Sequence, residues 1–171
     1  MNAWAVVTYG SLAVGIGLLV LHFVAWWPKG KGFDPRCLLE LVPFVLGYAY
    51  GALLVMGVGG LMGWMAGAVI WSVGWVGDAA LVYGVGGERT NLAQGQVMAL
   101  TNGGLWMVLV MTFLVVALRR RAAHLKEDIG RGVLTGILTG STPVIAGVLA
   151  VPLASAVNLA GAWISTGGAG A

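Results

Sequence analysis

The fold is decided by residues 38–85, which read LLELVPFVLGYAYGALLVMGVGGLMGWMAGAVIWSVGWVGDAALVYGV, 48 positions with only two charged side chains. A transmembrane helix needs about 20 mostly apolar residues, because it crosses a hydrocarbon layer about 30 Å thick. The stretch is too long for one span and long enough for two. We therefore predict a glycine-rich helical hairpin, with spans at 38–57 and 61–85 and a tight turn at 57–60.

Apolar segments of similar length lie on both sides of this stretch, and we expect further spans at residues 3–27, 101–118 and 144–164. The first ends in Trp26-Trp27-Pro28-Lys29, which combines an aromatic belt, a helix stop and a positive charge. Four or five spans are consistent with the sequence, and we favour five.

The last apolar run, residues 132–165, contains Pro143 and Pro152 and has two interpretations. It is either one long kinked helix, or a half-helix before Ser141-Thr142-Pro143 followed by the span at 144–164. We favour the second, because a proline after Gly-Ser-Thr is a typical helix break. The tail, residues 166–171, is expected to be frayed.

Composition agrees with a membrane protein. Hydrophobic residues make up 59% of the 171 positions and charged residues 9%, whereas a soluble domain carries about 25% charged residues. The chain has too few charges for a water-facing shell, which excludes soluble and disordered classes, and no nucleic-acid partner is expected. We predict a single all-α, polytopic integral membrane domain, 1–171. The bias toward Gly, Ala, Val and Trp, with Arg over Lys, suggests the inner membrane of a bacterium, or a phage or plasmid of such a host.

The basic residues create a conflict over topology. They cluster at 29–36 and at 119–131, and short loops rich in Lys and Arg lie in the cytoplasm. Five simple spans place the two clusters on opposite sides. We then expect the larger cluster, 119–131, in the cytoplasm and the smaller one outside. The alternative is that residues 38–85 cross only once, with the rest re-entrant or lying in the interface, which puts both clusters in the cytoplasm.

Glycine is the most prominent residue type, with 29 positions. Small residues at four-residue spacing let membrane helices approach closely. The positions with this spacing, which we predict to be helix-packing or oligomerisation sites, are Gly47, Gly51, Gly59, Gly63, Gly67, Gly136 and Gly140. Contacts within one chain and contacts between subunits both fit this pattern.

Polar residues inside apolar segments are the candidates for a transport route. Asp78 lies in the predicted third span, where a carboxylate near the bilayer centre costs about 2.5–3.5 kcal/mol on insertion scales. Ser141, Thr142 and Asn158 lie in the last apolar run. A route and an ordinary hydrogen-bonding role both remain open for these four residues.

Two surface features complete the candidates. Arg119, Arg120, Arg121 and Lys126 form a basic membrane-surface segment that can attract anionic lipid or act as a stop-transfer anchor. A helix that continues from the fourth span is one interpretation of this segment. Trp64, Trp71 and Trp75 form one stripe, in which Trp71 would lie near the midplane of a transmembrane helix, where tryptophan is less usual.

The sequence contains no motif for catalysis, metal or cofactor binding. It has one cysteine, two histidines, no GxSxG turn and no P-loop. We therefore predict a non-enzymatic, oligomerising membrane subunit, pore-forming or structural, of a larger assembly such as a secretion, conjugation, phage or holin-like system. The alternative is a small transporter or ion channel whose route is lined by Asp78 and the break at 141–143.

Overall fold

The computed structural model describes residues 7–27, 35–56, 60–92, 100–122, 125–142 and 151–165, and it is helical in nearly all of them. No β-strand occurs in these ranges, apart from an isolated bridge between Thr8 and Asn91. The elements are α1 (Tyr9–Trp26), α2 (Pro35–Met56), α3 (Gly60–Ala79), the π-helical η1 (Ala80–Val85), α4 (Asn102–Arg121), α5 (Lys126–Gly140) and α7 (Val151–Ser165). The prediction of an all-α chain is confirmed for the described residues.

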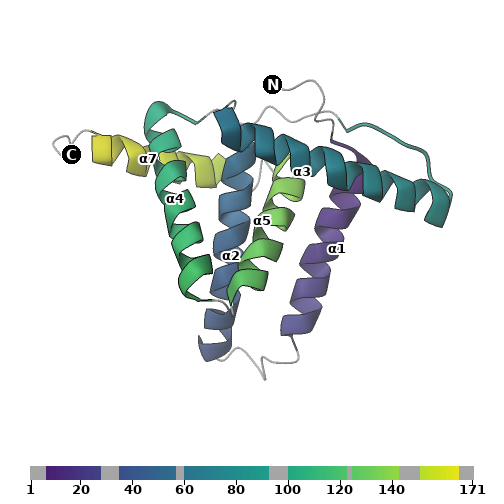
Figure 1. Cartoon of the computed structure of the whole chain (residues 1–171), viewed down its shortest axis with the longest axis horizontal. Coiled ribbons are helices and arrows are strands. Elements are labelled where there is room, and N and C mark those ends of the chain that lie inside the picture. Colours follow the sequence, from purple (N-terminus) through teal and green to yellow (C-terminus); the bar gives the residue numbers. More distant parts are fainter. Residues whose placement is uncertain are drawn as a thin grey trace.

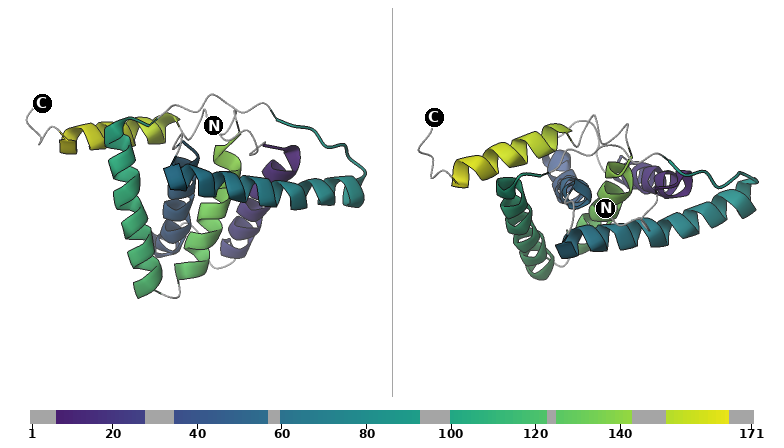
Figure 2. Two further views of the ribbon diagram at one scale, coloured as in Figure 1. Left: turned by 45° about the horizontal axis from the view of Figure 1, so that its top comes forward. Right: turned by 90° about the horizontal axis from the view of Figure 1, so that it is seen from above.

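Among the described residues, four helical segments are long and apolar enough to cross a membrane: Tyr9–Trp26, Leu38–Met56, Gly60–Val85 and Asn102–Arg121. By their direction, the described α-helices fall into two groups. α1, α2, α4 and α5 run side by side along one direction, whereas α3 and α7 lie crosswise near one end of this bundle (Figure 1, Figure 2). Length and composition alone therefore do not distinguish α3 from α1, α2 and α4, but its direction does.

α5 is the central helix of the bundle. It packs most extensively against α2 on one side and also contacts α1 on the other, and α3 crosses near its end (Figure 1). Eight of its fifteen residues are buried, and five of these are glycine or threonine in the run Gly132–Gly140. α4 and α7 pack against each other at the opposite flank of the molecule from α1 (Figure 2).

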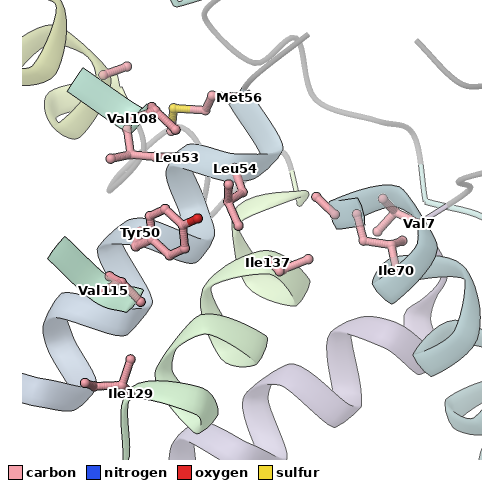
Figure 3. Packing of buried hydrophobic residues seen from close by; sticks show 12 residues of the cluster. Val7, Tyr50, Leu53, Leu54, Met56, Ile70, Val108, Val115, Ile129 and Ile137 are labelled. Carbon is pink, nitrogen blue, oxygen red and sulfur yellow. The ribbon is translucent and has the colours of Figure 1, made fainter. Parts of the chain in front are cut away.

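The hydrophobic core follows α2. Leu53, Met56, Ile129 and Leu138 are the largest fully buried apolar side chains. Leu53, Met56 and Ile129 share one cluster with Tyr50 and Val115 (Figure 3). Large apolar side chains also cover the outside: Leu21 is 67% exposed and Phe113 is 69% exposed. A chain with small and hydroxyl residues inside and large apolar residues outside fits a lipid solvent better than water.

The helix bounds differ from the expected spans at several points. The hairpin of 38–57 and 61–85 is not seen as two antiparallel spans, because α5 occupies the packing face of α2 and α3 turns across the bundle. The turn at 57–59 lies outside the described residues. The helix of the fourth span does not continue through the basic segment: it ends at Arg121, and Ala122 leaves the helical conformation with φ −118° and ψ 80°.

The last apolar run is also divided. α5 ends at Gly140 with Ser141 as its C-cap, so a separate helix precedes Ser141-Thr142. α7 begins at Val151 and has 15 residues, which is fewer than the span expected at 144–164. Residues 143–150 and the tail 166–171 lie outside the described residues.

Candidate functional site

Glycines join α2 and α5 backbone to backbone. A Cβ atom added to Gly47 or Gly51 would overlap the carbonyl oxygen of Ile129 or Val133 in α5. From the other side, a Cβ atom on Gly132 or Gly136 would overlap the carbonyl oxygen of Phe44 or Tyr48, and one on Gly140 would meet Ala52. We call this contact the glycine interface; it comprises Gly47, Gly51, Gly132, Gly136 and Gly140. It lies within one chain.

The sequence analysis missed one member of the glycine interface. Gly132 continues the four-residue spacing of Gly136 and Gly140, and that spacing was visible in the sequence. The remaining predicted packing glycines belong to another region: Gly67 is buried and Gly63 partly buried on α3. Gly59 lies outside the described residues.

Hydroxyl groups line the buried side of α5. Thr135 and Thr139 are buried and donate hydrogen bonds to carbonyl oxygens one turn earlier, at 2.8 and 2.7 Å. The hydroxyl of Tyr48 lies 3.0 Å from Thr139 Oγ1 and links α2 to α5. The predicted route residues Ser141 and Thr142 are buried as well, and they bond to the carbonyl oxygens of Leu138 and Thr139. The two hydroxyls of α5 and the two directly after it therefore all have partners within the protein.

Asp78 lies where α3 crosses the start of α1. Its side chain is 8% exposed, and its Oδ1 and backbone nitrogen occupy the space that a Cβ atom of Gly10 would need. Gly77 and Gly10 touch backbone to backbone at the same crossing. Gly10 is in the first turn of α1, which is capped by Thr8. A carboxylate at this position interacts favourably with the positive end of the helix dipole.

Asn158 has a structural partner at the other flank. Its Oδ1 accepts hydrogen bonds from the backbone N–H and the hydroxyl of Thr101, both at 3.0 Å. Gly103 and Gly161 approach backbone to backbone beside it. Asn158 thus links α7 to the N-terminal end of α4. This contact lies on the opposite flank of the molecule from the α1–α3 crossing that contains Asp78 (Figure 2). The structure therefore does not bring Asp78 and Asn158, two of the four predicted route residues, together.

The helix ends next to both basic clusters meet at one end of the bundle. α1 ends and α2 begins there, as α4 ends at Arg121 and α5 begins at Lys126 (Figure 1). Contacts between side chains support this placement: His22 Nδ1 of α1 lies 3.9 Å from Asp128 Oδ1 of α5, and the His22 ring stacks on Phe44 of α2 at 3.8 Å. We call this the basic end.

The position of the basic end differs from the arrangement that five simple spans would give. Five simple spans place clusters 29–36 and 119–131 on opposite sides, but the helices that flank the two clusters end on the same side of the bundle. Arg119, Arg120, Arg121 and Lys126 are all exposed there, and Arg131 pairs with Glu127 at 3.5 Å. The contact between His22 and Asp128 was not predicted, because no sequence pattern links residues 106 positions apart.

α3 exposes its tryptophans. Trp64, Trp71 and Trp75 are 53%, 59% and 63% exposed, while the opposite side of the helix is buried. We call these three residues the tryptophan stripe. A second apolar surface lies on α4, where a shallow hollow of about 230 Å³ is lined by Asn102, Leu105, Trp106 and Leu109.

Within the described residues, His, Cys, Asp and Glu side chains do not form any group of three or more that could hold a metal ion. Comparisons with protein-family models, with curated proteins and with solved structures find no match for this chain.

Proposed function

We propose that this chain is a non-enzymatic subunit of a membrane assembly, in which α1, α2, α4 and α5 cross the bilayer and the basic end faces the cytoplasm. The observation that carries the proposal is that the helices flanking both basic clusters end on the same side. Eight of the nine Lys and Arg residues belong to those clusters. With four crossings, both clusters obey the positive-inside rule, which five simple spans cannot satisfy.

Helix lengths support four crossings. α1, α2 and α4 have 18, 22 and 20 residues, which at 1.5 Å per residue gives about 27, 33 and 30 Å. These lengths match a hydrocarbon core of about 30 Å. α5, with 15 residues, is shorter, but it lies between α1 and α2, where protein surrounds it. At the basic end, Arg119–Arg121 and Lys126 are placed to attract anionic lipid, at about 1 kcal/mol per charge.

Cysteine labelling of intact bacterial cells tests the four crossings. The chain has a single cysteine, so Cys37→Ser provides a cysteine-free background. Gly30→Cys reports the segment between α1 and α2, and Val58→Cys reports the segment between α2 and α3. With four crossings, an impermeant maleimide labels Val58→Cys in intact cells and Gly30→Cys only after permeabilisation. Five simple spans with 119–131 inside require the reverse at both positions. Glu88→Cys should be labelled from outside under either topology and serves as the control.

We place the proposed contacts between subunits on α4. The glycine interface is occupied within one chain, whereas Trp106, Val110 and Phe113 form an exposed apolar stripe on α4, 69%, 52% and 69% exposed. Residues at this spacing share one face of a helix. This stripe, beside the hollow at Leu105 and Leu109, is the surface that we propose for a second copy of this chain.

Native mass spectrometry of the protein in nanodiscs tests the assembly. A discrete oligomer is expected for the unmodified chain, and Phe113→Ala should shift it toward the monomer. Leu21→Ala, which removes an equally exposed apolar side chain from α1, should leave the mass unchanged. A monomer for the unmodified chain, or equal effects of the two variants, would contradict an assembly through α4.

Buried hydroxyls in and directly after α5 support a second candidate, a small transporter or channel. Thr135, Thr139, Ser141 and Thr142 are all buried. Conduction past them requires the hydroxyls to release the carbonyl groups that they now bond. A flux assay in vesicles distinguishes the candidates: Thr139→Val should abolish flux in a transporter and leave the oligomer of an assembly subunit unchanged.

A further inference from the structure

α3 has two faces of opposite character. The buried face consists of the small or branched residues Ala66, Gly67, Ile70, Gly74 and Gly77 together with Asp78, and it packs on the bundle. The exposed face carries the tryptophan stripe, with Leu61 and Met65 beside it at 69% and 50% exposure. Neither α3 nor η1 contains Lys or Arg. A surface that receives this face must therefore recognise apolar and indole groups rather than positive charge.

The contacts of α3 fix its level along the bundle. Gly77 touches Gly10, and the Cβ position of Gly74 lies 3.4 Å from Thr8 Oγ1, so α3 packs on the first turn of α1. That turn is at the end of the bundle opposite to the basic end (Figure 1). α3 also runs across α1 and α5 rather than along them, and it lies on the side of the bundle rather than inside it (Figure 2).

Tryptophan has a strong preference for one environment in a membrane. Its ring is largely apolar and its N–H donates a hydrogen bond, so it gathers where hydrocarbon meets headgroups. In a helix that crosses the bilayer, Trp64, Trp71 and Trp75 would be spread over about 16 Å of depth, since 11 residues rise 1.5 Å each. In a helix that lies across the bundle, all three share one depth.

Resting on the four crossings proposed above, we propose that α3 lies in the headgroup region of the leaflet opposite the basic end, with the tryptophan stripe bound to lipid. α3 then acts as an interfacial anchor rather than a transmembrane span. α7 lies at the same end and exposes Trp163 at 65% (Figure 1). The binding is driven by apolar burial and the indole N–H, so it requires no anionic lipid.

Spin-label depth measurements test the anchor. Trp64→Cys, Trp71→Cys and Trp75→Cys are made in the Cys37→Ser background, labelled with a nitroxide and reconstituted in phosphatidylcholine vesicles. Oxygen, which enriches in hydrocarbon, and a polar nickel complex then report the depth of each label. We expect the three depths to agree to within about 5 Å, one helical turn. A steady change of about 16 Å from position 64 to position 75 would overturn the proposal and make α3 a span.

α4 supplies a matched control. Leu105→Cys and Val116→Cys are also 11 residues apart on exposed positions, at 47% and 44%. Their depths should differ by about 16 Å if α4 crosses the bilayer. A flat result on α4 contradicts the four crossings, whereas a sloped result on both helices overturns the anchor alone. Labels on α3 that meet only the nickel complex would also overturn it, because the stripe would then face water.

Discussion

At the scale of single residues, the glycine interface depends on the absence of a Cβ atom at each of its glycines. Gly136 has no room for a Cβ atom beside the carbonyl oxygen of Tyr48, whereas a Cβ atom on Gly17 of α1 meets nothing within 4 Å. Replacing glycine by alanine favours the helical conformation by about 1 kcal/mol of free energy at either site. Overpacking typically costs about 1–3 kcal/mol, so only Gly136 should lose stability.

We therefore expect Gly136→Ala to lower the thermal unfolding midpoint in detergent by a few degrees, and Gly17→Ala to leave it unchanged or raise it. Fluorescence-detected unfolding of the two variants side by side checks this. Equal midpoints would show that α2 and α5 are not in backbone contact.

The carboxylate of Asp78 is expected to stabilise the crossing of α1 and α3. Asp78→Asn keeps the shape of the side chain and removes its charge from the first turn of α1. The expected loss is about 0.5–1 kcal/mol, the range for a charge at a helix end. Glu88→Gln, at an exposed position after η1, is the control and should have no effect. A gain in stability for Asp78→Asn would mean that the cost of burying the charge exceeds its interaction with the helix.

At the scale of helices, α7 is held mainly by α4, the helix against which it packs most extensively. Asn158→Leu removes both hydrogen bonds to Thr101, each worth about 0.6 kcal/mol in a membrane protein. The loss of about 1 kcal/mol should speed amide hydrogen exchange in α7 about fivefold. Ser155→Leu, an exposed position on the same helix, should not change the exchange rate. Equal exchange in α2 and α5 for all three proteins would show that the effect is local.

The helices themselves were predictable from the sequence, but their partners were not. The apolar runs at 38–57 and 101–118 contain helices with bounds within a few residues of the prediction, α2 (Pro35–Met56) and α4 (Asn102–Arg121). The spacing of Gly47 and Gly51 indicates that another helix approaches α2 closely, but it does not identify that helix. Glycines at the same spacing occur in both α3 and α5. The partner depends on the shape of both surfaces, so the α2–α5 contact required the structure.

The direction of α3 was one of two alternatives that the sequence left open. Its residues satisfy the length and hydropathy of a span, and a helix in the interface needs many of the same apolar side chains. Trp71 was the residue that disagreed with a span, since it would lie near the midplane. The two basic clusters also disagreed with five spans. Each of these two signals was weak by itself. They are connected only through the position of α3 relative to α1, which the structure supplies.

At the scale of the whole molecule, orientation follows from how the basic residues are shared between the two sides. With four crossings, the clusters 29–36 and 119–131 act together, and eight positive charges hold one side in the cytoplasm. With five spans, the clusters oppose each other, with three charges against five. Replacing Arg119, Arg120 and Arg121 by Gln leaves five positive charges on one side in the first case. In the second case it leaves two against three, which favours inversion.

We expect the triple Arg→Gln variant to keep its orientation. Glu88→Cys in the Cys37→Ser background provides the measurement, because residue 88 faces the outside under both topologies before the change. In the variant with four crossings, an impermeant maleimide should still label this cysteine in intact cells. If the label requires permeabilised cells, the protein has inverted, the two clusters were opposed, and the four-crossing topology is wrong. Retained labelling requires that cluster 29–36 lies on the same side as 119–131, because no other group of Lys and Arg in the sequence remains to hold the orientation.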